Sequence, residues 1–229
     1  MAEQAIVVAA DAPGWRAPGA RRFARRLAAN GALVVTPDLH RGDTWYGEPS
    51  PDARAKNPDF AGWAEGHPPS RVASDVAAVI TALRERGAKR VAAVGLGMGA
   101  RGVTTLLAAD ADADANARSD ANARADAGAV VCPIGVEPEA AGRAAAAEAP
   151  VVFVWGGGDD AAAAAEKTEK AAEAAAGTAA AGKWASRAFV ERQADFAFAP
   201  RVGEGETCEE DEAEAASLVL EWTAGEAGR

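Results

Sequence analysis

Short, uninterrupted apolar runs recur along the chain and are separated by longer amphipathic or alanine-rich stretches. Such a run, bounded by polar positions, is typical of a strand that is buried on both faces of a parallel sheet. The first of them, residues 5–10, reads Ala-Ile-Val-Val-Ala-Ala. The pattern predicts strands at 5–10, at 32–35, at the start of 90–108, at 129–132, at 150–155 and near 185–190.

The intervening stretches have helical patterns. Phe23 and Leu27 lie one turn apart within residues 21–30, and Gly31 follows at the usual C-terminal position. Further helices are predicted at 72–83, over the alanine-rich segment 159–183 and after the acidic run 204–214. The alternation of strand and helix predicts an α/β fold: a three-layer α/β/α sandwich around a mostly parallel sheet. We expect a single domain over residues 1–229, with ligands at the carboxyl ends of the strands.

Two segments lack a clear strand or helix pattern. Residues 40–70 are rich in proline, glycine and charge and carry several aromatic residues, which predicts a long loop. Such a loop is either a lid or wall of the site or an ordinary surface excursion held by its aromatic residues. Residues 109–127 alternate Ala, Asp, Asn and Arg, which indicates a solvated helix end and an insertion.

Composition narrows the classes of partner. The 229 residues carry a net charge of −10, so the chain repels phosphate backbones and anionic membranes, and we expect neither nucleic acid nor membrane as a partner. Two cysteines do not form a disulfide framework, and the N-terminus lacks the features of a signal peptide. No apolar run reaches the length of about 20 residues that a membrane span requires. We therefore expect a soluble, intracellular (cytoplasmic) protein, either a monomer or a homodimer.

The segment 90–108 combines a buried strand, a glycine-rich turn and a helix. In α/β-hydrolases this unit carries the nucleophile in the frame Gly-x-Nuc-x-Gly. The frame glycines here are Gly95 and Gly99, and the nucleophile position holds Gly97. The nucleophile of this turn normally has a strained backbone conformation, which glycine adopts readily. The fold can therefore persist although the reactive side chain is absent.

Three segments follow predicted strands: Asp-Ala-Pro-Gly-Trp at 11–15, Pro-Asp-Leu-His-Arg-Gly at 37–42 and Gly-Leu-Gly-Met-Gly at 95–99. Together they resemble the dienelactone hydrolase family of α/β-hydrolases. Members of one branch read Asp-Ile-Phe-Gly-Trp, Pro-Asp-x-x-x-Gly and Gly-Phe-Cys-x-Gly-Gly at these places. The similarity runs from about residue 6 to 222, and by this resemblance we expect the family's N-terminal hairpin region to be absent. The resemblance implies hydrolysis of lactones or small esters, with no metal and no organic cofactor.

The family's catalytic cysteine, aspartate and histidine are only partly present. The cysteine position is Gly97, and the aspartate corresponds to Asp159 in Gly-Gly-Gly-Asp. The histidine position is Phe196, or Asp195 if the alignment slides by one residue, and Arg201 matches the arginine that follows. Because Asp159 has no imidazole to orient, we interpret it as a cap of the alanine-rich helix.

The residues that could replace the missing groups are few. His40 and His67 are the two histidines of the chain, and both precede the turn, whereas the histidine of an α/β-hydrolase follows it. A loop histidine is typically a surface residue, which is our expectation for His40; the alternative is a histidine at the mouth of the site that stands in as base. Cys132 is expected to be a small buried residue, and neighbouring glutamates suppress the thiolate of Cys208.

The oxyanion hole can remain after the nucleophile is lost, because it consists of backbone groups. By resemblance, the oxyanion hole uses the N–H groups of Met98 and of the loop near Ala12. The cleft itself is predicted to be lined by Asp11, Trp15, Met98, Phe196 and Arg201. Either Arg201 or Arg41 could hold the carboxylate of a ligand, although both could equally be solvated.

We therefore expect a non-catalytic member that binds a small ester-like or lactone-like molecule or serves as a partner subunit. One alternative is a residual hydrolase that uses another group, such as a water positioned by Asp159. A second alternative is dinucleotide binding, because Gly95-x-Gly97-x-x-Ala100 also matches the Gly-x-Gly-x-x-Ala fingerprint. Two strand–helix units precede this fingerprint, and the acidic residue expected about 20 positions later would fall in the solvated segment.

Overall fold

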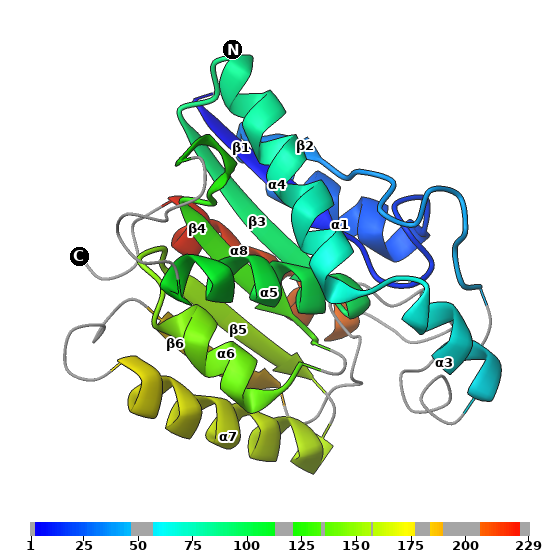
Figure 1. Cartoon of the computed structure of the whole chain (residues 1–229), viewed down its shortest axis with the longest axis vertical. Coiled ribbons are helices and arrows are strands. Elements are labelled where there is room, and N and C mark those ends of the chain that lie inside the picture. The colour runs from blue at the N-terminus through cyan, green and yellow to red at the C-terminus, as the bar shows by residue number, and fades with distance from the viewer. Residues whose placement is uncertain are drawn as a thin grey trace.

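The centre of the molecule is a parallel sheet, seen in the computed structural model in Figure 1. The structure describes residues 3–46, 57–112, 121–133, 136–156, 158–176, 184–189 and 207–224. Within these residues the six strands have the order β2-β1-β3-β4-β5-β6, and every neighbouring pair is parallel. The strands are β1 (Gln4–Ala9), β2 (Leu33–Val35), β3 (Arg90–Leu96), β4 (Ala127–Val131), β5 (Val151–Gly156) and β6 (Trp184–Phe189). The predicted strands are thus confirmed, and the sheet is wholly rather than mostly parallel in the described part.

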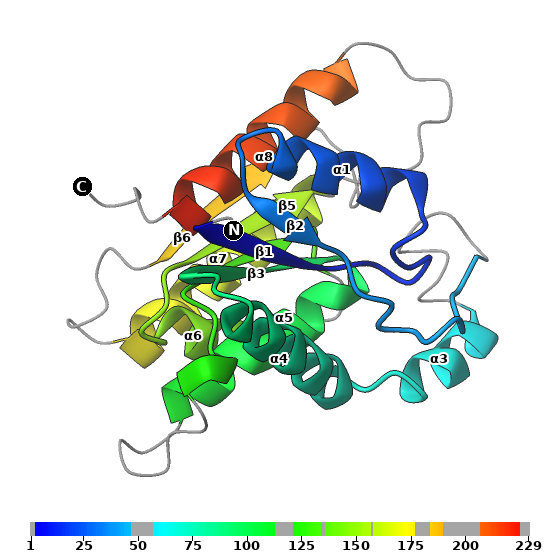
Figure 2. The ribbon, with the colours of Figure 1, turned by 90° about the horizontal axis from the view of Figure 1, so that it is seen from above.

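Helices cover both faces of the sheet, as Figure 2 shows. One face carries α1 (Pro18–Ala28) and α8 (Thr207–Ala224). The opposite face carries four helices: α4 (Pro69–Glu85), α5 (Met98–Asp112), α6 (Pro138–Ala145) and α7 (Gly158–Ala176). The short helix α3 (Pro58–Glu65) lies to one side of these layers, and a 3-10 turn, η1, covers Ala121–Ala123. The predicted three-layer sandwich is confirmed. None of the helices in the described ranges is both long and apolar enough to cross a membrane.

The two cores follow from the alternation of side chains along each strand. In β1, Ile6 and Val8 face the layer of α1 and α8, where they pack with Phe23. Val7 faces the other layer, where it packs with Ile80 of α4. All five side chains are fully buried, which explains why the strands read as unbroken apolar runs.

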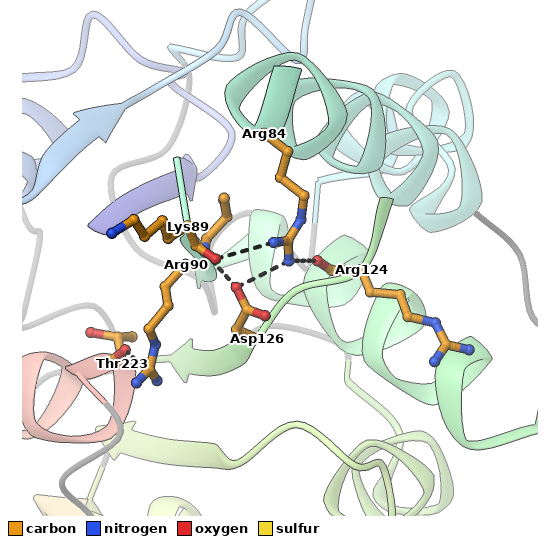
Figure 3. A network of polar contacts seen from close by, with 7 residues as sticks. Arg84, Lys89, Arg90, Arg124, Asp126 and Thr223 are labelled. Carbon is orange, nitrogen blue, oxygen red and sulfur yellow. Dashed lines mark hydrogen bonds and ion pairs between the residues drawn. The ribbon is translucent and has the colours of Figure 1, made fainter. Parts of the chain in front are cut away.

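A polar network ties the amino ends of the central strands to the helices, as Figure 3 shows. One carboxylate oxygen of Asp126 accepts hydrogen bonds from the Val91 N–H at 2.6 Å and from Arg84 at 3.0 Å. Arg90 donates to the carbonyl of Thr223 at the end of α8, at 3.5 Å. Because Arg90 begins β3, this network lies at the end of the sheet opposite to the carboxyl edge, and we assign it a structural role.

Three features of the connections differ from the predictions. Residues 57–65 of the predicted loop form a cap and a helix: the Asn57 side chain accepts the Asp59 N–H at 2.8 Å, and Pro58 opens α3. Helix α6 was not predicted, although Pro138 marks its start in the same way. The residues from 47 to 56, also in the predicted loop, lie outside the described part of the chain. The acidic run at 204–214 does not precede the last helix, because α8 already begins at Thr207.

Candidate active site

Three loops meet at the carboxyl edge of the sheet because β2, β1 and β3 are neighbours there. Asp11 follows β1, His40 lies in the loop after β2, and Gly97 directly follows β3. Parallel strands bring the residues that follow them to one edge, which is where open α/β sheets bind ligands. The structure therefore brings together residues that are up to 86 positions apart in the sequence, from Asp11 to Gly97.

The turn between β3 and α5 has the geometry expected of a nucleophile turn. Gly97 has a φ of +53°, which confirms the expected left-handed backbone at this position. The frame glycines are required by close packing. A Cβ on Gly99 would overlap the carbonyl of Ala9, and one on Gly95 would lie 2.5 Å from the Cα of Ala100. The turn is thus intact around a position that has no side chain.

The Asp11 carboxylate occupies the space beside Gly97. Asp11 is 5 % exposed, and its Oδ1 accepts a hydrogen bond from the Met98 N–H at 2.8 Å. A Cβ built on Gly97 would lie 2.5 Å from the Asp11 Cγ and would overlap Oδ1. The carboxylate therefore fills the volume of the missing nucleophile and engages the backbone donor predicted for the oxyanion hole. Ala12, the other predicted oxyanion-hole residue, is fully buried, and its carbonyl accepts a hydrogen bond from the backbone N–H of Trp45 at 3.0 Å.

His40 is buried, so the expectation that it is a surface residue was wrong. It is 5 % exposed, and its Nε2 lies 3.0 Å from the carbonyl oxygen of Asp11. Burial lowers the pKa of His40 below its ordinary value of 6.5, and the charge of His67 acts in the same direction. The hydrogen bond to Asp11 and the charges of Asp11 and Asp38 oppose this shift without reversing it. His40 is therefore neutral at pH 7.

His67 joins His40 in an aromatic cluster. The two rings are in edge contact, with centroids 5.2 Å apart. Trp63 stacks on His67 at 4.3 Å and meets His40 edge-on at 5.2 Å. The Nδ1 of His67 lies 2.8 Å from the Trp63 carbonyl, and its Nε2 lies 3.7 Å from a carboxylate oxygen of Asp43. Sequence reasoning missed this cluster, although both histidines of the chain stand within the aromatic segment that follows β2.

A wall of larger aromatic residues covers the turn. Phe60 of α3 packs against Ala12 and Met98, and Trp45 and Trp63 pack against this group. The Phe60 and Trp63 rings stack at 5.5 Å. Of the two interpretations of the 40–70 segment, a site wall and a surface excursion, this packing favours the site wall.

The remaining predicted ligand residues are spread more widely. Trp15 is half-buried under the guanidinium of Arg16, 4.9 Å from the ring centroid. The Arg41 side chain is 65 % exposed and pairs with Asp75 of α4 at 3.1 Å, so a ligand carboxylate would have to compete with this pair. Phe196, its alternative Asp195, and Arg201 lie outside the described residues, so their roles stay predictions.

Asp159 and the cysteines complete the predicted set. Helix α7 begins at Gly158, so Asp159 is a residue of the first turn and not the N-cap that we expected. Cys132 is 2 % exposed and packs with the strand residues of one core, as predicted, with a φ of +47°. Cys208 lies in α8. Within the described ranges, no three of the histidines, cysteines and acidic residues are arranged to hold a metal ion.

The fold and the turn now identify the class of protein. The model of the dienelactone hydrolase family matches residues 1–224. The chain belongs to this family, and thereby to the α/β-hydrolase superfamily.

Similar proteins with curated descriptions are hydrolases by name. The chain is 34 % identical over 104 residues to the hydrolase pyvD of Aspergillus violaceofuscus, which covers 45 % of this chain and 40 % of that protein. It is 34 % identical over 84 residues to an endo-1,3;1,4-beta-D-glucanase of Zea mays, covering 37 % of this chain and 25 % of that protein. Each match thus spans less than half of the relative. Among solved structures, LpqC, a poly(3-hydroxybutyrate) depolymerase from Bordetella parapertussis, has a TM-score of 0.45 and 19 % identity, covering 95 % of this chain and 80 % of that one.

The geometry of the turn counts against the dinucleotide alternative. That alternative gave Gly97 a purpose, because a missing side chain would let a phosphate approach the helix. In the structure the Asp11 carboxylate fills this space and takes the Met98 N–H. A phosphate would meet a negative charge at the point where the fingerprint requires a free backbone donor.

Proposed function

We propose that this member of the dienelactone hydrolase family binds a small molecule at the carboxyl edge of its sheet without hydrolysing it. The observation that carries the proposal is the hydrogen bond from the Met98 N–H to the Asp11 carboxylate, beside a nucleophile position that is a glycine. The family's covalent route needs a side chain that attacks a carbonyl and a backbone donor that receives the resulting oxyanion. Gly97 supplies no attacking atom, and the donor is already bonded.

The size of the second effect supports the proposal independently of the first. Removing one oxyanion-hole donor from a working hydrolase lowers kcat by about 10²- to 10³-fold. A donor that already bonds the Asp11 carboxylate cannot bond an oxyanion, so it is as ineffective as a donor that has been removed. The carboxylate also places a negative charge at the point where negative charge builds up in the transition state. Both effects disfavour ester hydrolysis even if another group supplied the nucleophile.

A second candidate function is hydrolysis by an activated water. One observation favours it: His40 is a neutral imidazole whose Nδ1 has no hydrogen-bond partner among the described residues. Such a nitrogen could take a proton from water as the water oxygen bonds to an ester carbon. The proton would then pass to the departing alkoxide as the acyl–oxygen bond breaks. This route gives His40 the role of base, which the sequence analysis kept as an alternative for this residue.

A panel of activated esters and small lactones separates the two functions. We expect the wild-type chain to hydrolyse p-nitrophenyl acetate and dihydrocoumarin no faster than buffer does. His40→Phe and Asp159→Ala are the informative variants, and circular dichroism confirms that each is folded. Turnover by the wild type that disappears in either variant would show that the chain is a catalyst, and the proposal would then be wrong. Turnover that survives in both variants would show that the chain is a catalyst that uses another residue, and the proposal would be wrong in that case too.

A further inference from the structure

The tautomer of His40 is fixed by its partner. A backbone carbonyl only accepts hydrogen bonds, so the His40 Nε2, 3.0 Å from the Asp11 oxygen, carries the proton. In a neutral ring the lone pair then belongs to Nδ1. This nitrogen is fully buried and has no hydrogen-bond partner among the described residues. A buried acceptor without a partner costs about 1–3 kcal/mol, and such groups are rare in folded proteins.

A small hollow lies next to this imidazole. It holds about 260 Å³ of atom-free space, part of it open solvent, and has room inside for roughly one water molecule. Apart from His40 and His67, its lining is apolar side chains and backbone, namely Ala10, Leu39, Trp63, Val72, Met98 and Gly99. An apolar lining disfavours a charged group, because burying an ammonium or a carboxylate without a charged partner is far costlier than burying a neutral one.

We infer that the hollow receives a neutral hydroxyl group of a ligand, which donates its hydrogen bond to the Nδ1 of His40. The inference rests on the proposed binding function and names the class of ligand. This arrangement is the opposite of a hydrolase site, where an oxyanion hole offers hydrogen-bond donors to a carbonyl oxygen. Here the Met98 donor is bonded to Asp11, and the group without a partner among the described residues is an acceptor, the Nδ1 of His40. Carbonyl and carboxylate ligands lack the proton that this acceptor requires.

The charged and titratable neighbours of His40 leave its acceptor available. Asp11 lies on the side of Nε2, His67 meets the ring edge-on, and Asp38 belongs to the same loop. His67 differs from His40, because its Nδ1 carries a proton that it donates to the Trp63 carbonyl at 2.8 Å. The two histidines of the chain therefore give different imidazole ¹⁵N patterns, and each ring can be assigned without a substitution.

The test uses phenol, anisole and benzoate, which share one ring and differ in the group presented. Imidazole ¹⁵N spectra of the full chain are recorded with each probe at equal concentration. We expect phenol to shift the unprotonated nitrogen of the His40 ring, and anisole and benzoate to leave it unchanged. A comparable shift with benzoate or anisole, no response to phenol, or a wild-type His40 ring protonated at Nδ1 would each overturn the inference.

Two variants give a second readout. In His40→Phe we expect phenol binding to weaken about three- to tenfold, the range for one lost hydrogen bond. Thr104→Val is the matched control, because Thr104 is a buried residue whose hydroxyl also has no partner among the described residues but which does not line the hollow. Equal phenol affinity in wild type and His40→Phe would overturn the inference. Ester turnover in the same samples would count against the proposed function alone, since the spectra report the hydroxyl contact either way.

Discussion

Gly97 and Asp11 form a complementary pair. The glycine alone would leave a gap at the base of the turn, and the carboxylate alone would have no room beside a larger residue, because a Cβ at position 97 would overlap its Oδ1. The buried charge is stabilised by the Met98 N–H, which lies at the N-terminus of α5, where the helix dipole favours an anion. The missing side chain is thus matched by a neighbour that uses its space.

This pairing predicts the stability of Gly97→Ala. The substitution adds a Cβ at a φ of +53° and forces the Asp11 carboxylate away from its donor. We expect a loss of about 2–4 kcal/mol in the free energy of unfolding, measured in urea. Gly31→Ala is the matched control, because Gly31 has a φ of +85° but no atom within 4 Å of its added Cβ, so it carries the backbone penalty alone.

The contribution of the carboxylate follows from a double-mutant cycle. In an Asp11→Ala background, the cost of Gly97→Ala should fall towards that of Gly31→Ala, because the overlap with Oδ1 and Cγ is then absent and only the Cβ of residue 11 stays close, at 3.0 Å. Additive effects of Asp11→Ala and Gly97→Ala would contradict the pairing.

The burial of His40 predicts how stability responds to acid. Its folded-state pKa lies below the ordinary 6.5, so the unfolded chain binds more protons than the folded one as the pH falls below 6.5. The stabilising effect of neutral His40 is complete above 6.5 and is lost progressively as the pH falls towards the lowered value. We expect urea midpoints between about pH 7.5 and pH 5 to fall more steeply for the wild type than for His40→Phe. The slopes should differ by at most about 1.4 kcal/mol per pH unit. Parallel slopes would show that His40 protonates as easily in the folded chain as in the unfolded one.

At the scale of elements, the sequence predicted what continuous apolar runs determine. The strands were found because residues buried on both faces are apolar without interruption, as Ile6 and Val7 illustrate. Helix α3 was missed because its proline and its glycine lie among loop residues, and only the capping contact of Asn57 distinguishes it. The turn at Gly97 was predicted from its frame, whereas the burial of His40 was not, because it depends on a side-chain packing that no local pattern contains.

Helix α8 shows how a charge can join two elements. Glu212 is fully buried and accepts from Arg22 at 2.7 Å and from Arg26 at 2.8 Å, so it fastens α8 to α1. Glu212→Gln removes the buried carboxylate that these two half-buried guanidinium groups share, and we expect a loss of about 2–4 kcal/mol in the free energy of unfolding.

A neighbouring pair on the same helix provides the control. Glu214 bonds Arg187 of β6 at 3.2 Å, but the two side chains are 48 % and 59 % exposed, so Glu214→Gln should cost less than about 1 kcal/mol. Equal losses in the two variants, measured by urea unfolding, would show that burial does not decide the strength of these contacts.

At the scale of the whole molecule, two electrostatic effects oppose an anionic ligand. The chain carries a net charge of −10, which repels anions at long range, and Asp11 adds a negative charge at the turn itself. The first effect is screened by salt over about 10 Å at 0.1 M ionic strength, whereas the buried carboxylate is screened much less. The two contributions can therefore be separated by experiment.

Asp11→Ala separates them, because it frees the Met98 N–H and leaves the rest of the charge in place. We expect benzoate to shift the Met98 amide resonance in this variant but not in the wild type, since only the variant offers a free donor at the helix N-terminus. Benzoate binding to the variant should strengthen as salt is raised, because screening weakens the long-range repulsion, while phenol binding to the wild type should stay constant. Benzoate binding of equal strength to wild type and variant would mean that the carboxylate leaves this donor free in solution, and the proposed reason for the loss of hydrolysis would fail with it.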